Sequence, residues 1–217
     1  MITTIHQPDF MPWIGYFDKI KSSELLIYLD DVQFSRRGWT HRDKIKVLDK
    51  FVWLTVPIEK KNNYHQSIKE LKIKDNLALY KIHLDIIKNA YRKSKNFDQV
   101  FPSLEKIYKK NYTFLIDLNI EIIDLFCDFL EIKKKTFFSS QYNISTKSTE
   151  RLIDLLEINN SKKYLTGEPS KSYIDTDIFK KKGIEIIWHN LDEKEYIKKY
   201  DRFNRNLSTL DFLMNKI

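Results

Sequence analysis

Glycine is scarce in this sequence. It occurs only four times in 217 residues, where an average usage of about 7% would give about 15. The four positions, Gly15, Gly38, Gly167 and Gly183, are all more than fifteen residues apart. The sequence therefore excludes a G-x-G-x-x-G dinucleotide turn, a P-loop and a G-x-S-x-G nucleophile elbow.

Cysteine and long apolar runs are also lacking. The single cysteine, Cys127, excludes a disulfide framework and a cysteine-rich zinc site. It lies in an apolar helical run, so we expect a buried, unreactive thiol. The sequence contains no H-E-x-x-H motif or similar spacing that would predict a metal site, and nothing in it indicates a cofactor. No secretory signal and no apolar run of about 18 residues is visible, so we expect no membrane span and a cytoplasmic location.

Positive charge is in excess, and the net charge of +8 raises nucleic acid as a partner. Only seven of the 38 basic residues are arginine, whereas recognition of phosphates and bases favours the planar guanidinium fork. The scattered lysines favour a solvated surface. The second interpretation is a basic site for a phosphorylated small molecule.

Apolar runs of strand length alternate with helical patterns at both ends of the chain. Strands are predicted at residues 2–5, 25–29, 164–166 and 184–188, and a hairpin at residues 44–48 and 51–57. Helices are predicted from residue 13, over 76–91, from 103 to about 132 with a break near Asn111, and over 150–157 and 177–182, the last followed by Gly183. This order predicts one Rossmann-like α/β domain over residues 1–217, with a largely parallel sheet and a helical block at about 76–132.

Polar clusters follow three of the predicted strands. They are His6-Gln7, Asp30-Asp31 and Thr166-Gly167. Ligands bind beyond the carboxyl ends of parallel strands, so these clusters indicate a site. His6 could bind an anion or transfer a proton, or fix its loop by a hydrogen bond. One of the two aspartates could act as a base or hold a divalent ion, or cap a turn.

The densest cationic stretch carries aromatic residues between its charges. It comprises Arg36, Arg37, Arg42, Lys44 and Lys46, with Trp39 and His41 among them. Fixed cations and an aromatic face suit a phosphate-bearing ligand with a base to stack on. An exposed basic loop is the alternative. The other histidines give weaker signals: His83 favours a structural role on its helix, and His65 and His189 have no partner recognisable from the sequence.

Several strings resemble the WbqC-like family. The first, at residues 5–20, reads IHQPDFMPWIGYFDKI, and LDDVQF follows at 29–34. The resemblance continues through Arg42, residues 45–46, LTVP at 54–57, Tyr91, YLTG at 164–167, Tyr173 and LSTLDFL at 207–213. It covers almost the whole chain in order. It implies an association with bacterial surface-polysaccharide (O-antigen, lipopolysaccharide) pathways, including those that decorate amino sugars with small acyl or aminoacyl groups.

A second resemblance is confined to the N-terminal turn. Residues 10–16 (FMPWIGY) are similar to the phosphate-binding turn of HUP-type nucleotidyltransferases. Those enzymes carry a second histidine where this chain has Tyr16. The similarity implies nucleotide binding, and it keeps an ATP-using adenylyltransferase as an alternative.

Together these patterns predict a transferase that modifies a nucleotide-linked amino sugar, by transfer of an acyl or aminoacyl group such as glycyl. The catalytic candidates are His6, Asp30 and Asp31. The substrate-binding candidates are Gln7, Trp13, Tyr16, Arg36, Arg37, Trp39, Arg42, Lys46, Thr166, Gly167 and Tyr173. The expected partners are a nucleotide sugar and an activated donor, of which an aminoacyl-tRNA is one form. An RNA- or tRNA-binding module is a further alternative, which would give the +8 charge a use.

Overall fold

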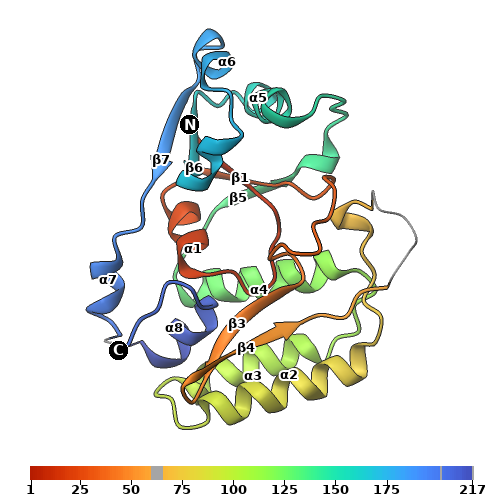
Figure 1. Cartoon of the computed structure of the whole chain (residues 1–217), viewed down its shortest axis with the longest axis vertical. Coiled ribbons are helices and arrows are strands. Elements are labelled where there is room, and N and C mark those ends of the chain that lie inside the picture. The colour runs from red at the N-terminus through yellow and green to blue at the C-terminus, as the bar shows by residue number, and fades with distance from the viewer. Residues whose placement is uncertain (60–65, 201, 217) are drawn as a thin grey trace. The chain divides into compact units, whose positions relative to one another are not determined.

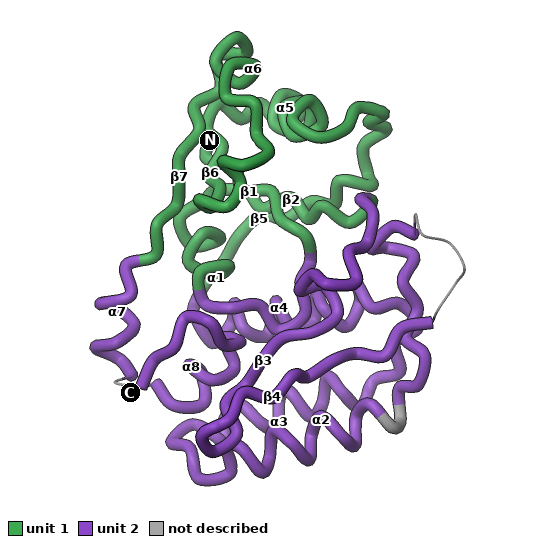
Figure 2. The backbone as a smooth tube through the Cα atoms, in the orientation of Figure 1, with its two compact units in different colours: residues 1–7, 15–31, 132–191 green, residues 8–14, 32–131, 192–217 purple. Residues whose placement is uncertain are grey.

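The chain forms two compact units, each assembled from separate stretches of sequence (Figure 2). The computed structural model describes residues 1–59, 66–200 and 202–216, so His65 lies outside the described residues. Unit 1 comprises residues 1–7, 15–31 and 132–191, and unit 2 comprises residues 8–14, 32–131 and 192–217. The single-domain organisation over residues 1–217 stays a prediction.

Unit 1 contains a five-stranded parallel sheet. Its strands are β1 (Ile2–His6), β2 (Leu25–Tyr28), β5 (Lys135–Phe138), β6 (Lys163–Gly167) and β7 (Glu185–His189), in the spatial order β5-β2-β1-β6-β7. All four neighbouring pairs are parallel. The predicted Rossmann-like α/β fold is thereby confirmed. The short strand β5 is absent from the prediction, because a four-residue KTFF segment that follows two further lysines carries little periodicity.

Helices pack on this sheet through an apolar core. They are α1 (Ile14–Lys21), α5 (Ser148–Ile158) and α6 (Thr176–Lys181), with short 3-10 turns at Ser139–Gln141 and Glu168–Ser172. Ile27 of β2 and Leu155 of α5 are fully buried in this core, and the rings of Tyr164 and Phe179 stack at 5.6 Å. Gly183 follows α6 with a φ of 64°, the left-handed conformation expected at a helix end.

Unit 2 consists of a two-stranded hairpin and a set of helices. Strands β3 (Arg42–Val47) and β4 (Lys50–Thr55) pair antiparallel, which confirms the predicted hairpin. The helices are α2 (Asn76–Tyr91), α3 (Phe97–Tyr108), α4 (Leu115–Phe129), α7 (Glu193–Ile197) and α8 (Thr209–Asn215), with a 3-10 turn at Ile68–Glu70. Figure 1 shows α2 and α3 side by side next to the hairpin.

The helical block agrees with the prediction except at one boundary. Helix α2 has the predicted bounds, and the break near Asn111 falls between α3 and α4. The predicted start at residue 103 is wrong, because α3 begins at Phe97 and contains Pro102. Proline is favoured in the first turn of a helix, where its missing N–H needs no partner, but Pro102 is the sixth residue of α3. Its position therefore hid the first turn of α3.

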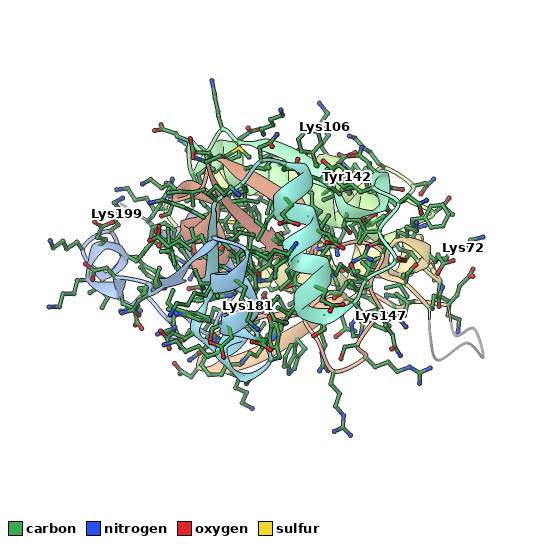
Figure 3. The ribbon with its side chains drawn as sticks, turned by 90° about the horizontal axis from the view of Figure 1, so that it is seen from above. Lys72, Lys106, Tyr142, Lys147, Lys181 and Lys199 are labelled. Atoms are coloured by element: carbon green, nitrogen blue, oxygen red, sulfur yellow. The ribbon has the colours of Figure 1, made fainter. Side chains whose placement is uncertain are left out.

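The surface charge agrees with the solvated-lysine interpretation at most described lysines. Lys106, Lys147 and Lys199 are exposed, and Figure 3 shows Lys106 and Lys199 pointing away from the ribbon. Over the described residues, none of the helices combines the length and apolarity that crossing a bilayer requires.

Candidate functional site

The predicted polar clusters of unit 1 lie at one edge of its sheet. Because all strands are parallel, the carboxyl ends of β1, β2, β5, β6 and β7 share that edge, which we call the carboxyl edge. The strand order changes direction at β1, with β2 on one side and β6 on the other. The ladder between β1 and β6 covers only Ile2 and Thr3 of β1. The two strands therefore stop pairing before their carboxyl ends, at the place where sheets of this type bind ligands.

His6 ends β1 and is held by its immediate surroundings. Its Nδ1 lies 3.1 Å from the carbonyl oxygen of Gln7, and its ring meets the Tyr16 ring edge-on at 4.6 Å. The Tyr16 hydroxyl donates to the same carbonyl at 3.3 Å. Burial lowers the pKa of His6 to about 3, and the charge of Lys19 acts in the same direction. The imidazole is therefore neutral at physiological pH, and its predicted catalytic role stays a prediction.

Asp30 and Asp31 follow β2 and connect it to the end of β5. Asp30 Oδ1 accepts the Ser140 N–H at 2.9 Å and its Oδ2 accepts the Ser140 hydroxyl at 2.6 Å. Ser139 Oγ lies 3.0 Å from Asp30 Oδ1 and 2.5 Å from Asp31 Oδ1. Asp31 also pairs with Arg151 of α5 at 2.5 Å. Both carboxylates are thus held by protein groups, Asp30 by Ser140 and Asp31 by Arg151, which gives them a structural role.

The third polar cluster is a chain of hydroxyls at the end of β6. Thr166 donates to Ser170 at 2.9 Å, and Ser170 lies 2.8 Å from the hydroxyl of Tyr173. Gly167 joins the strand to the 3-10 turn that carries these residues. The structure thus brings the predicted Thr166 and Tyr173 into one network through Ser170, which the sequence analysis did not select.

His189 also gains a partner at the carboxyl edge. Its Nε2 lies 2.7 Å from Oδ2 of Asp18 on α1. The pair joins residues 171 positions apart, so no local pattern in the sequence could reveal it.

Unit 2 contains a cavity of about 260 Å³, which we call the aromatic cavity. It is lined by Trp13, Trp39, Asp43, Lys44, Arg205 and Asn206. Three stretches that are distant in sequence meet here: the proline-rich segment, the cationic stretch and the segment before α8. The two predicted stacking residues, Trp13 and Trp39, therefore lie at one cavity. Asp43, Arg205 and Asn206 are functional candidates that the sequence analysis missed.

Backbone hydrogen bonds hold these three stretches together. The Phe10 N–H donates to the Trp39 carbonyl at 3.1 Å, and the Ser208 N–H donates to the Lys44 carbonyl at 2.9 Å. Thr209 donates to the Pro12 carbonyl at 2.9 Å. Buried backbone N–H and C=O groups require hydrogen-bond partners. These bonds therefore hold the lining residues of the cavity in place.

The proline-rich segment is strained at its centre. Met11 is fully buried and has a φ of 46°, a conformation that costs a non-glycine residue of order 1–3 kcal/mol. Such strain persists only where the surrounding structure holds it, and it concentrates at functional sites. Here it lies two residues before Trp13.

Cations lie over the tryptophan rings of the aromatic cavity. The Arg205 guanidinium is 5.5 Å from the centre of the Trp13 ring, and the Lys44 ammonium is 5.7 Å from that of Trp39. Arg205 also pairs with Glu193 at 2.7 Å. A cation over an indole face is attracted by the electron-rich face of the ring and keeps its positive charge. The cavity therefore combines positive charge with flat apolar surface.

Asp43 is the most perturbed carboxyl group near the aromatic cavity. It is 3% exposed, and burial raises its pKa to about 8. The hydrogen bond from its neighbour's backbone, Lys44 N–H to Asp43 Oδ1 at 2.6 Å, opposes the rise, and the charge of Asp9 adds to it. A carboxyl group that titrates near neutral pH at a cavity is a candidate acid or base.

The remaining members of the cationic stretch lie outside the cavity lining. Arg36 and Arg37 are exposed, and Arg42 donates to the carbonyls of Gly38 and Arg37. The charge of Lys46 acts to lower the pKa of Asp211, whose carboxylate accepts the Tyr91 hydroxyl at 2.9 Å.

Two other candidate side chains of unit 2, His41 and Cys127, have pKa values that keep them uncharged near neutral pH. His41 does not add to the positive charge, because burial and Arg42 lower its pKa to about 4. Cys127 is only partly buried, whereas a buried thiol was expected. Its thiol is nevertheless a poor nucleophile, because burial and the nearby Asp124 raise its pKa to about 12. Within residues 1–59, 66–200 and 202–216, no group of three or more His, Cys, Asp or Glu side chains is placed to hold a metal ion.

Comparison with known proteins gives a consistent relationship. The chain is 31% identical over 213 residues to an uncharacterized protein of Mycobacterium tuberculosis, an overlap of 97% of this chain and 92% of that protein. No solved structure matches the chain. The model of the WbqC-like protein family matches residues 7–217, which takes in both the carboxyl edge after β1 and the aromatic cavity. This chain belongs to the WbqC-like protein family.

Proposed function

We propose that this protein is a transferase that places an acyl or aminoacyl group on a nucleotide-linked amino sugar, with the reacting sugar in the aromatic cavity. Membership of the WbqC-like family suggests a role in surface-polysaccharide biosynthesis. The observation that carries the finer proposal is the lining of the cavity: a carboxyl group whose pKa is raised to about 8 lies beside two tryptophans and two cations.

The size of the aromatic cavity limits what it can hold. Its volume of about 260 Å³ is near the lower end of the range for small-molecule sites, about 300–1,000 Å³. It suits a single ring, either one sugar or one base, with the rest of the nucleotide outside. Trp13 and Trp39 offer flat faces for the ring, and Arg205 and Lys44 offer charge for the diphosphate.

Asp43 is the proposed base. The sugar amine attacks the carbonyl carbon of the activated donor, a nitrogen–carbon bond forms, and the bond to the donor's leaving group breaks. The amine proton passes to the Asp43 carboxylate, and the leaving group departs with its electron pair. A positioned base typically contributes about 10²–10⁴-fold, and a group with a pKa near the working pH is the most effective.

The carboxyl edge of unit 1 supplies the alternative base. The contacts of His6, Asp30 and Asp31 do not test the catalytic roles predicted for these residues. Asp30 already accepts hydrogen bonds from Ser140, and Asp31 is paired with Arg151. His6 is a weak proton acceptor because of its low pKa. We therefore place the proton transfer at Asp43 and test His6 in parallel.

The test is a substrate panel. Purified protein is mixed with nucleotide amino sugars, each alone and with acyl or aminoacyl donors, and examined by calorimetry and by mass spectrometry. We expect one sugar to bind and to gain the mass of the donor group. Asp43→Asn should bind the sugar and fail to transfer, and Asp49→Asn, an exposed acid in the same hairpin, should behave as the wild type.

Two results would count against the proposal. If no sugar in the panel binds or gains mass, nucleotide-sugar transfer is wrong. If ATP with magnesium instead yields pyrophosphate, the adenylyltransferase alternative is correct.

A further inference from the structure

We propose that the exposed face of the β3–β4 hairpin binds single-stranded RNA. This face, which we call the hairpin face, consists of Trp39, Arg42, Lys44, Phe51 and Trp53. The inference deepens the proposed function, on which it rests for its biological meaning, by naming the macromolecule that would carry the activated donor group.

The hairpin register places cations opposite aromatic rings. Lys44 of β3 pairs with Trp53 of β4, and Lys46 pairs with Phe51. Side chains alternate between the two faces of a strand. Arg42, Lys44 and Lys46 therefore share the face that carries Phe51 and Trp53, while Asp43 and Ile45 are buried on the other.

The aromatic rings of the hairpin face are unusually exposed. Phe51 is 54% exposed, Trp39 is 47% and Trp53 is 42%. The rings of Trp39 and Trp53 lie 5.5 Å apart at an angle of 32°. Large aromatic side chains grouped on a surface mark a binding site, whereas isolated ones do not. Flat faces of this kind are the surfaces on which unpaired bases stack.

Lys44 is surrounded by rings rather than by acids. Its ammonium lies 5.4 Å from the centre of the Trp53 ring, 5.7 Å from that of Trp39 and 5.9 Å from that of Phe51. No carboxylate among the described residues pairs with it within 4.0 Å. The Arg42 guanidinium lies 4.6 Å from the Trp53 centroid and is fixed by the Arg37 and Gly38 carbonyls. Both cations are thus held in place beside the rings.

The surrounding charge is complementary to a polyanion. Residues 35–55 contain six basic residues and two acidic ones. One of the two, Asp43, is largely neutral near pH 7, since its pKa is raised to about 8. Rings alone would suit an apolar partner and charge alone would suit any polyanion. Their alternation on one face favours a single strand, which offers phosphates and unpaired bases together.

The hairpin face adjoins the aromatic cavity through shared residues. Trp39 and Lys44 line the cavity and also belong to the face. An RNA end that stacks on Trp53 would therefore reach the cavity over a distance of one or two side chains. This continuity suits a carrier whose terminal group reacts with a sugar held in the cavity.

The experiment measures binding of a fluorescein-labelled oligoadenylate to the full chain by anisotropy, at several salt concentrations. We expect binding whose affinity falls with salt by about 0.7 in log–log slope for each phosphate contacted. Trp53→Ala and Phe51→Ala should each weaken binding by about 5- to 150-fold, the range for removal of one stacking ring. Lys44→Ala should lower the salt slope by about 0.7.

The matched control is a second lysine–phenylalanine pair on unit 2. Lys72 lies 5.9 Å from the ring centre of Phe114, which is 36% exposed. Phe114→Ala removes a ring with the same cation geometry away from the hairpin and should leave oligoadenylate binding unchanged. Circular dichroism on each variant excludes loss of fold as the cause.

The outcomes separate this inference from the proposed function. Nucleotide-sugar binding by Trp53→Ala should equal that of the wild type, because Trp53 does not line the cavity. The inference is overturned if oligoadenylate does not bind, if Phe114→Ala weakens it as much as Trp53→Ala does, or if heparin, a polyanion without bases, binds equally well and is unaffected by Trp53→Ala. Failure of sugar binding with intact RNA binding would instead overturn only the proposed function.

Discussion

The carboxyl edge of unit 1 and the aromatic cavity of unit 2 are both rich in polar groups, yet they treat charge in opposite ways. At the carboxyl edge, Asp30 and Asp31 are saturated by Ser139, Ser140 and Arg151. Around the cavity, Lys44 is surrounded by aromatic rings and Asp43 is buried with a raised pKa. The charges at the carboxyl edge are paired with other groups of the protein. The charges around the cavity would gain more stabilisation from a bound ligand.

The contrast teaches that strand-end position alone does not identify a site. A buried carboxylate that accepts several hydrogen bonds stabilises the fold, and its removal leaves other groups unpaired. A buried carboxyl without a cationic partner costs stability at neutral pH. Carboxyl groups with strongly shifted pKa values are concentrated at functional sites, where the reaction needs the shifted pKa.

The largest effect should come from Asp43→Asn on the proposed transfer reaction. The substitution keeps the shape and removes the base, so kcat should fall by about 10²–10⁴-fold. In the wild type, kcat/KM should rise with pH and level off above about 8, because only the ionised form of Asp43 accepts a proton. Steady-state rates from pH 6 to 9 test this. If His6→Ala abolishes transfer and Asp43→Asn does not, the reaction takes place at the carboxyl edge.

The next effect is on stability at the carboxyl edge. Arg151→Met leaves the largely buried Asp31 carboxylate without its partner, since the two side chains are 12% and 18% exposed. We expect a loss of about 3–5 kcal/mol in the free energy of unfolding, measured by urea denaturation. The double variant with Asp31→Asn should recover part of the loss, because the unpaired charge is gone. Equal free energies of unfolding for the single and double variants would show that the loss does not come from the unpaired Asp31 charge.

A smaller effect should appear in the pH dependence of stability. The folded pKa of Asp43, about 8, is above its unfolded value, so the folded state holds the extra proton and stability falls as pH rises toward 8. Asp43 by itself should lower the free energy of unfolding by about 2 kcal/mol between pH 6.5 and 8. His6, His41 and His83 offset part of this loss, because the unfolded state still binds protons at them near pH 6.5. Below pH 6.5 stability should fall again, because the unfolded state takes up protons at His6, His41 and His83, whose folded pKa values are lowered to between about 3 and 4.

The control for this profile is Asp43→Asn, which cannot titrate. Its stability should rise slightly from pH 6.5 to 8, because the unfolded state loses its histidine protons over this interval. Its free energy of unfolding relative to that of the wild type should increase by about 2 kcal/mol from pH 6.5 to 8. Urea denaturation at each pH gives both curves. A difference between the two curves that stays constant over this interval would contradict the raised pKa.

The smallest stability effect should come from Arg205→Met at the aromatic cavity. Its ion pair with Glu193 is well exposed, at 44% and 39% for the two side chains. We expect less than about 1 kcal/mol of lost stability, in contrast to Arg151→Met. Affinity for the nucleotide sugar should nevertheless fall at least about tenfold, the usual scale for a charged hydrogen bond to a ligand. Calorimetry on this variant sharpens the comparison, because an unchanged affinity would remove Arg205 from the site.

Most of the fold was predictable from local patterns. Continuous apolarity in Leu25–Tyr28 indicated a strand covered on both faces, and it lies inside the parallel sheet. The apolar period of Asn76–Tyr91 gave the bounds of α2. Three short elements, β5, α7 and α8, were missed, because four to seven residues carry too little periodicity to distinguish them from loop.

The candidate site was only half predictable. Trp13 and Trp39 stood out because aromatic residues beside prolines and arginines form a local pattern. Asp43 could have been found from the hairpin itself, since it shares a strand face with the buried Ile45. Arg205 could not, because its place beside Trp13 depends on hydrogen bonds from residues 208 and 209 to distant segments.

By itself, the sequence determined the element types, the parallel α/β class and the absence of glycine-rich phosphate loops, because these follow from periodicity and composition along neighbouring residues. Only the tertiary structure decided which polar groups are saturated and which are not. That difference depends on partners more than a hundred residues away, such as Arg151 for Asp31 and the 205–208 segment for Trp13. The physical reason is that charge compensation and desolvation act through space, and no local window of sequence contains both partners.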